Sequence, residues 1–487
     1  MTDRPPSTYS PAALEPEDWG AFRTIAHRLL DDMLDDLAHR RDRPLWQPIP
    51  DEVRALYREP SPRGTAPLGG LRERFLATIL PYTAGNTHPG FMGWVHGGGT
   101  ALGMVAEMLA AGLNANLGGR DHMPVEVERQ VLRWAHEWFR FPTDAGGVLV
   151  TGASTANLIA VLVARQRALG PAVRHDGVAA HRLTAYAGTS AHACVGQAME
   201  IAGLGGAALR RVPLDGAFRI DQRALAEAIA ADRAAGSTPF LIVGTAGTVD
   251  VGAIDDLGAL ADRAAAEGAW FHVDGAMGAL GVLSPEIAPL VAGIERADSI
   301  AFDFHKWGQV PYDAGCVVVR DGRLHQQTFA APAAYLRREA RGLAGGAPWL
   351  CDFGPDLSRG FRALKVWLTI KHFGTDRLGA VMAECCRLAR VLGDRIDAEP
   401  DLERLAPVAL NIVCFRHRAG DDVSRAIAIA LQEAGQVAPS TTTIDGRLAL
   451  RAAIVNHRTA EQDIAALVDQ AVAAGRRLAT LDPPPSP

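Results

Sequence analysis

The chain has 487 residues, of which 48% are hydrophobic and 21% are charged. This balance supports a large folded core and excludes a disordered or fibrous chain. The formal net charge of −6 gives no reason to expect a nucleic-acid partner or binding to an anionic membrane surface.

The N-terminal part predicts a helical arm over residues 1–85. Apolar residues recur at helical spacing from Phe22 to Leu37, with aspartates on the opposite side. Two stretches rich in proline and glycine follow, at residues 41–50 and 58–70. No apolar run approaches the roughly 20 residues of a membrane helix and the first residues lack a secretion signal, which predicts a cytoplasmic protein.

Strand and helix patterns alternate in the next part of the chain. Short apolar runs predict buried strands at 182–188, 239–245, 269–275, 299–304 and 314–320. Helical patterns lie between them at 154–169, 221–235 and 255–268. The alternation predicts an α/β domain over residues 86–362, with a mainly parallel sheet that binds ligands at the carboxyl ends of its strands.

A smaller α+β domain is expected over residues 363–487. A helical pattern at 361–374 leads into it, and apolar runs at 409–417 and 447–455 predict strands. The six cysteines are scattered and form no C-x-x-C pair, so we expect reduced thiols and no metal site.

Lysine is rare in this chain. Of the 49 basic residues only Lys306, Lys365 and Lys371 are lysines, and the other 46 are arginines. Arginine cannot lose its proton near neutral pH and so cannot form an imine, whereas lysine can. A lysine kept in such a background therefore indicates a residue whose amine takes part in the chemistry. Lys365 and Lys371 fall in an amphipathic helical pattern and are expected on a helix surface, which leaves Lys306.

Lys306 and Asp274 follow neighbouring predicted strands and can face one ligand at the same sheet edge. A lysine that forms a Schiff base and a carboxylate that keeps a pyridine nitrogen protonated are the two groups that pyridoxal phosphate most needs. The turn at residues 152–155 enters a helix whose N–H groups could hold a phosphate. His192 could stack on a flat ring. Taken singly, these features are also typical of a structural ion pair, a helix cap and a structural histidine.

Together the motifs resemble the pyridoxal-phosphate-dependent group II decarboxylases. They are TGASTAN at 151–157, SAH around His192, GT-x-x-x-GA-x-D at 247–255, HVDGA around Asp274 and D-x-HKW around Lys306. The family includes aromatic-L-amino-acid, glutamate, cysteine sulfinate and diaminobutyrate decarboxylases. The resemblance spans about residues 87–459. It implies the PLP-dependent transferase fold (fold type I) with a seven-stranded sheet, pyridoxal 5'-phosphate as cofactor, and a homodimer with shared active sites.

The resemblance also implies residue roles. Lys306 would bind the cofactor covalently, Asp274 would pair with the pyridine nitrogen, and His192 and Ala276 would lie on opposite faces of the ring. The other cofactor-binding residues that it implies are Ala153, Ser154, Thr248, Asp303 and His305.

Tyr335, in a loop from Ala330 to Gly346, matches the family's mobile-loop tyrosine, which protonates the α-carbon after CO₂ leaves. Family members without that tyrosine tend to form aldehydes, so Tyr335 favours an amine product. The expected activity is therefore decarboxylation of an L-amino acid, with an aromatic side chain favoured.

The substrate remains open at this point. Trp94 indicates an aromatic pocket, whereas Asn114 and Asn116 look more like the glutamate and cysteine sulfinate branch. Val249 stands where the family often has threonine, and Arg359 lacks the family's second arginine. An acidic or small polar amino acid is the alternative substrate.

Three other functions are alternatives. An aldehyde-forming oxidative deaminase on the same fold is the first. A serine hydrolase is suggested by HGGG at 96–99, but no G-x-S-x-G elbow accompanies it. A nonenzymatic cofactor-binding protein is disfavoured because Lys306 and Tyr335 are both present.

Overall fold

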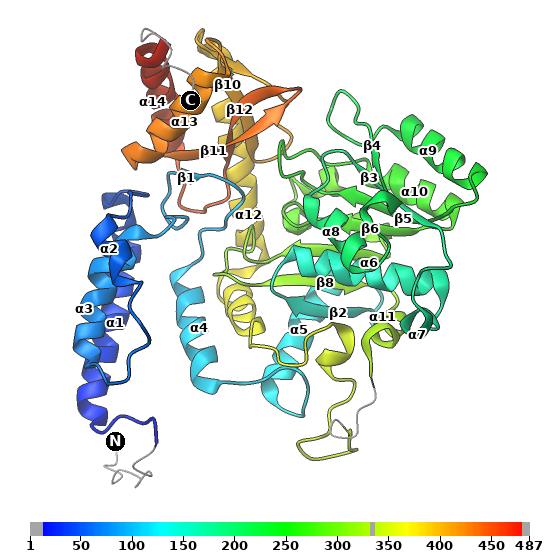
Figure 1. The fold of residues 1–487 in the computed structure, drawn as a ribbon, viewed down its shortest axis with the longest axis horizontal. Helices are drawn as coiled ribbons and strands as arrows, with labels where there is room; N and C mark the ends of the chain where they lie inside the picture. Colours follow the sequence, from blue (N-terminus) through cyan, green and yellow to red (C-terminus); the bar gives the residue numbers. More distant parts are fainter. Residues whose placement is uncertain (1–12, 332–336, 480–487) are drawn as a thin grey trace. The chain divides into compact units, whose positions relative to one another are not determined.

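The structure of the protein is a computed structural model that describes residues 13–331 and 337–479 (Figure 1). The chain divides into two compact units, Met1–Gly85 and Asn86–Pro487. In the described part of the chain, no helix is both long and apolar enough to cross a bilayer. Tyr335 lies outside the described residues.

The first unit is helical, as its amphipathic pattern predicts. Its α-helices are α1 (Trp19–Ala38), α2 (Asp51–Leu56) and α3 (Leu68–Thr78). The Asp18 carboxylate caps α1 by accepting a hydrogen bond from the Gly20 N–H at 2.7 Å. Arg72 of α3 donates two hydrogen bonds to Asp32 of α1, at 2.6 and 2.7 Å, and this bidentate pair links the two helices.

A seven-stranded sheet forms the centre of the second unit (Figure 1). Its strands are β2 (Gly146–Val150), β3 (Leu183–Gly188), β4 (Leu209–Val212), β5 (Thr238–Thr245), β6 (Trp270–Asp274), β7 (Ser299–Asp303) and β8 (Gly315–Val319). Their order in space is β2-β8-β7-β6-β5-β3-β4. β8 runs antiparallel to β7 and β2, and the other pairs are parallel. The predicted mainly parallel sheet is confirmed.

Helices cover both faces of this sheet. They are α5 (Met123–Trp138), α6 (Ala153–Leu169), α7 (Val173–Asp176), α8 (Ala193–Ile201), α9 (Gln222–Ala234), α10 (Leu257–Glu267) and α11 (Gly322–Phe329). Successive strand residues point to opposite faces. In β5, Leu241 and Val243 pack into the core under α6 and α8, whereas Ile242 packs into the core under α9 and α10. Burial on both faces explains why these strands read as continuous apolar runs.

A second, five-stranded sheet has the order β1-β11-β12-β10-β9. Its strands are β1 (Phe91–Met92), β9 (Leu402–Arg404), β10 (Ile412–His417), β11 (Ala438–Ile444) and β12 (Arg447–Ala453). The short β1 pairs in parallel with β11. The segment after residue 90 therefore joins a sheet that is otherwise built from the C-terminal part of the chain.

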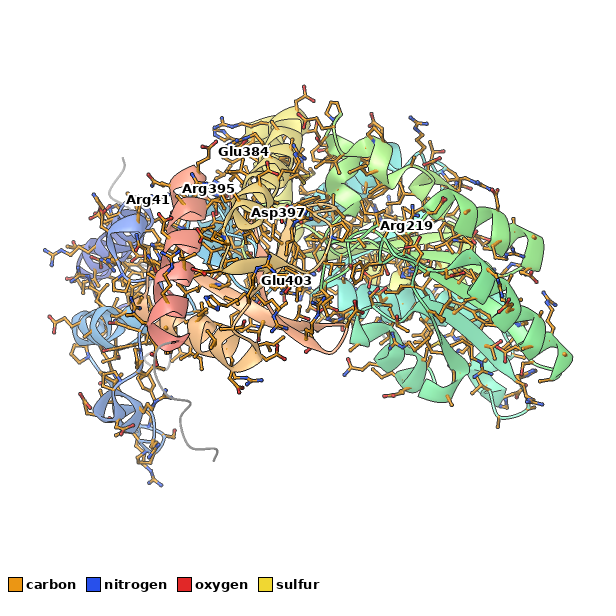
Figure 2. All side chains as sticks on the ribbon, turned by 90° about the horizontal axis from the view of Figure 1, so that it is seen from above. Arg41, Arg219, Glu384, Arg395, Asp397 and Glu403 are labelled. Atoms are coloured by element: carbon orange, nitrogen blue, oxygen red, sulfur yellow. The ribbon has the colours of Figure 1, made fainter. Side chains whose placement is uncertain are left out.

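The remaining helices are α4 (Ala101–Leu113), α12 (Ala363–Ala398), α13 (Asp421–Ala434) and α14 (Glu461–Ala479). α12 contacts α5, which flanks the large sheet, and also β10 and α14. Its charged residues Glu384, Arg395 and Asp397 are labelled in Figure 2. The prediction that Lys365 lies on the helix surface is wrong. Lys365 is 2% exposed, and its ammonium group forms an ion pair with Glu107 of α4.

A buried ion pair holds the neighbourhood of β2 together. The Arg359 guanidinium, 3% exposed, lies 2.5 Å from the Glu128 carboxylate, which is fully buried. Arg359 also donates to the carbonyl oxygens of Leu117 at 3.0 Å and Leu149 at 2.7 Å. Glu128 in turn accepts a hydrogen bond from the Leu149 N–H at 3.0 Å. One ion pair thus ties α5, β2 and the loop after α4.

Replacing Arg359 with methionine is expected to lower the free energy of unfolding by about 3–5 kcal/mol, because the Glu128 charge is left buried without its partner. Urea unfolding followed by circular dichroism measures this loss. Arg223→Ala, at an exposed helix pair, is the control and should move the midpoint little. A double variant, Glu128→Leu with Arg359→Met, should be less destabilised than the sum of the two single changes. An additive result would contradict coupling between the two charges.

Candidate active site

A cavity of about 550 Å³ lies at the carboxyl ends of β5, β6 and β7, where Thr245, Asp274 and Asp303 are the last strand residues. Thr441 of β11 and Arg451 of β12 line it from the second sheet. The other lining residues are Trp94, Val95, His96, Thr151, Gly152, Ala153, Ser154, His192, Cys194, Gly247, Val249, Ala276, Met277, His305, Lys306 and Tyr312. The cavity is therefore built by both sheets.

Lys306 is held by Asp303. The Lys306 Nζ lies 2.9 Å from Asp303 Oδ2, and the other carboxylate oxygen accepts a hydrogen bond from the Ala153 N–H at 2.8 Å. His305 Nδ1 accepts from the Ala314 N–H at 3.0 Å, so a neutral His305 carries its proton on Nε2, 3.7 Å from Asp303. Burial lowers the pKa of His305. The lysine amine is thus positioned by a carboxylate that is itself fixed by backbone.

Asp274 is a buried carboxyl group at the cavity wall, 3% exposed. Burial raises its pKa, against the lowering effect of a 3.2 Å hydrogen bond from the Ala276 N–H and of the Lys306 and His192 charges. Among the described residues, none forms an ion pair with it within 4 Å. An acid buried in this way fits a ligand with a cationic N–H, such as a protonated pyridine nitrogen.

The N-terminus of α6 opens at the same cavity. Gly152 is its N-cap and offers no side chain to satisfy the first N–H groups. A Cβ on Gly315, at the start of β8, would lie 2.4 Å from the Gly152 Cα, so these two glycines let the backbones pass closely. The Ala153 N–H is bonded to Asp303 and the Thr155 N–H to the Gly152 carbonyl oxygen, whereas the Ser154 N–H has no partner among the described residues. This N–H group and the helix dipole fit a phosphate.

His192 is the N-cap of α8. Its Nδ1 accepts a hydrogen bond from the Cys194 N–H at 3.2 Å, so a neutral ring carries the proton on Nε2. This hydrogen bond fixes the plane of an otherwise exposed ring at the cavity wall. The placement fits stacking on a flat cofactor.

Arg451 is a buried cation that sequence reasoning missed. It is 4% exposed, and its Nε donates to Ser440 Oγ at 3.2 Å while Nη1 donates to the Val249 carbonyl oxygen. Within residues 13–331 and 337–479 no carboxylate pairs with it. A guanidinium that reaches this cavity without an acidic partner can bind a ligand carboxylate.

The structure brings nine of the predicted site residues to this cavity. They are Trp94, Ala153, Ser154, His192, Asp274, Ala276, Asp303, His305 and Lys306. Thr248 does not line it, and its hydroxyl accepts a hydrogen bond from the Ala253 N–H at 3.0 Å. Asn116 also lies elsewhere, and its side chain accepts from the Gly118 and Arg359 N–H groups. Asn114 lines a separate cavity of about 400 Å³, and Tyr312 lines both cavities.

Comparison with known proteins gives consistent matches. The model of the family described as the pyridoxal-dependent decarboxylase conserved domain matches residues 50–418. An aromatic-L-amino-acid decarboxylase from Bacillus atrophaeus is 29% identical, over 91% of this chain and 93% of the relative. A phenylacetaldehyde synthase from Arabidopsis thaliana is 26% identical, over 93% of this chain and 94% of the relative. A crystal structure of Oryza sativa TDC with PLP and tryptamine superposes with a TM-score of 0.88 at 26% identity, covering 96% of this chain and 100% of that one.

Proposed function

This chain belongs to the pyridoxal-dependent decarboxylase family, and on that premise we propose that it converts an aromatic L-amino acid to the corresponding amine and CO₂. It is a carboxy-lyase of fold type I, and its cofactor is pyridoxal 5'-phosphate. The observation that carries the proposal is the cavity itself, which places Lys306, Asp274 and the α6 N-terminus around one space.

Bound pyridoxal phosphate supplies an electron sink for the electrons of the bond that breaks at the α-carbon. In the proposal, Lys306 would hold the cofactor covalently, Asp274 would keep a proton on its pyridine nitrogen, and the Ser154 N–H would help hold its phosphate. His192 would stack on the ring. Asp303 would keep the Lys306 amine oriented toward the cavity.

Two further roles concern the substrate. Arg451 binds its carboxylate, because the guanidinium lines the cavity and no described acid neutralises it. The rings of Phe91, Trp94 and His96 stack on one another, with centroids 5.7–6.2 Å apart, and form an aromatic wall of which Trp94 and His96 line the cavity. We assign proton donation to the α-carbon to Tyr335, on family resemblance.

We extend the proposal to a cytoplasmic homodimer. Helix α4 exposes Met108, Leu109 and Leu113, which are 51%, 48% and 62% exposed, and it contains a single charged residue, Glu107. An apolar helix face of this kind is typical of a subunit interface. The six cysteines are all unpaired, which is common in a reducing compartment.

One observation favours an alternative substrate. Arg451 could bind a side-chain carboxylate instead of the α-carboxylate, in which case an acidic amino acid would be preferred.

The relative named phenylacetaldehyde synthase supports aldehyde formation as the alternative reaction.

The direct test is product analysis with the purified holoenzyme. We expect amine and CO₂ in equal amounts from L-tryptophan, L-tyrosine or L-phenylalanine, and at least about tenfold lower kcat/KM for L-glutamate and L-cysteine sulfinate, a difference of about 1.4 kcal/mol. Mass spectrometry identifies the products. Aldehyde with hydrogen peroxide and ammonia would overturn the amine assignment, and faster turnover of the acidic substrates would overturn the aromatic one.

A further inference from the structure

The glycine run at 97–99 packs against the backbone that carries Lys306. A Cβ on Gly97 would lie 2.2 Å from the His305 carbonyl oxygen and 2.8 Å from that of Lys306, and a Cβ on Gly98 would lie 2.6 Å from the Asn456 side chain. Only glycine allows this approach. The HGGG motif therefore serves here to press the chain against the lysine segment and to place His96 at the cavity.

The His96 ring is fixed by other rings. It stacks on Phe91 at 5.7 Å with an interplanar angle of 11° and on Trp94 at 5.9 Å with an angle of 22°. The Tyr312 ring meets it edge-on at 5.8 Å. Stacking of this kind holds the orientation of the imidazole without using its nitrogen atoms.

Both ring nitrogens of His96 remain available to a ligand. In the described part of the chain, neither forms a hydrogen bond, and the residue is partly buried at the cavity wall. Burial and the nearby positive charges of Lys306 and Arg451 lower the pKa of His96, so the ring is neutral near pH 7. A neutral imidazole offers one donor and one acceptor, whereas the indole N–H of Trp94 can only donate.

We propose that His96 accepts a hydrogen bond from a polar group on the substrate ring, so that the preferred side chain carries its own donor, as a phenol or an indole does, and is not an unsubstituted phenyl. This inference rests on the proposed function and narrows its substrate class. The wall of Phe91, Trp94 and His96 is apolar over its ring faces, and His96 is its one acceptor. A phenyl ring would leave that acceptor without a partner, whereas a ring O–H or N–H would satisfy it.

The test compares ligands that differ by one hydroxyl group. Tyramine and phenethylamine are titrated into the holoenzyme by isothermal calorimetry, and kcat/KM is measured for L-tyrosine and L-phenylalanine. In the wild type both comparisons should favour the hydroxylated member. His96→Phe keeps the stacked ring and removes the acceptor, so it should weaken tyramine binding and tyrosine turnover by about three- to tenfold. It should leave phenethylamine and phenylalanine nearly unchanged.

Trp94→Phe is the matched control within the same wall. It removes ring area and the indole donor but keeps His96, so it should weaken all ring ligands alike and preserve the preference for the hydroxyl group. His96→Gln, which restores an acceptor without the ring, should recover part of that preference. The cofactor's visible absorbance confirms that each variant is folded and loaded.

Several outcomes would overturn the inference. Equal losses for tyramine and phenethylamine in His96→Phe would show that His96 acts by packing alone. Equal losses for both amino acids, with both amines unaffected, would place His96 on the carboxylate. If the wild type prefers tyramine, His96→Phe abolishes that preference, and neither amino acid is decarboxylated, the proposed function fails while the assignment of His96 stands. If the wild type decarboxylates both amino acids without any preference, the proposed function stands and the assignment of His96 fails.

Discussion

Replacing Lys306 with alanine is expected to reduce amine formation by about a thousandfold or more, the scale on which loss of a covalently acting group operates. Lys306 is the one lysine that lines the cavity, and its amine lies 2.9 Å from Asp303. Lys365 is paired with Glu107, and Lys371 lies over the rings of Trp134 and Trp367. Neither can substitute for it.

The scarcity of lysine makes the attachment site directly measurable. Borohydride reduction of the wild-type holoenzyme should fix the cofactor on one peptide, the one that contains residue 306, and mass spectrometry reads which of three lysines carries the added mass. Lys306→Arg keeps a cation beside Asp303 but cannot form an imine, so it should be as inactive as Lys306→Ala.

Lys371→Ala is the control, since this residue is exposed on α12 and should leave attachment and turnover unchanged. Cofactor found on residue 365 or 371 in the wild type, or full activity in Lys306→Ala, would contradict the assignment of the site.

Much of this site follows from local sequence pattern. Asp274 and Lys306 each come at or just after the end of a buried apolar run, and β6 and β7 are neighbours in the sheet, with Asp274 opposite Ala301. Parallel strands necessarily bring such ends to one edge. The N-cap positions of Gly152 and His192 are also local, because a small-residue turn or a capping side chain is visible beside each helix.

The parts that sequence reasoning missed depend on packing between distant segments. Arg451 reaches the cavity because it bonds to the Val249 carbonyl oxygen across 202 positions of the chain. Nothing in its local pattern separates it from the other arginines. Lys365 has amphipathic surroundings, yet α4 covers it and supplies Glu107 as its partner. His96 reaches the cavity because β1 joins the second sheet and glycines follow.

The second large effect is expected at Asp274. Asp274→Asn removes the carboxylate that keeps the pyridine nitrogen protonated but preserves the size of the side chain, so kcat should fall by about 10²- to 10³-fold, the cost of losing one preorganised electrostatic partner. The cofactor should remain attached to Lys306, as its absorbance reports. Wild-type kcat in Asp274→Asn would show that the carboxylate does not serve the reaction.

Stability gives a second, independent readout for Asp274. Burial raises the pKa of this carboxyl group in the folded protein above the value of about 3.9 in the unfolded chain. The folded state then binds a proton that the unfolded state releases, so the stability of the cofactor-free protein falls as pH rises through that interval. Asparagine cannot ionise. Cofactor-free Asp274→Asn should therefore unfold at a higher temperature than cofactor-free wild type at neutral pH, and the gap should close toward pH 4.

Adding pyridoxal phosphate should reverse that order, because a cationic pyridine nitrogen compensates the buried carboxylate in the wild type and has no charged partner in the variant. The melting temperatures of wild type and Asp274→Asn, each with and without cofactor, measure this reversal of the order of stability. A carboxylate retained for stability alone would make Asp274→Asn less stable in both forms. A carboxylate retained for the cofactor would make Asp274→Asn more stable than wild type without cofactor and less stable than wild type with it. We expect this second pattern, because Asp274 is buried and has no ion-pair partner within 4 Å in the described residues.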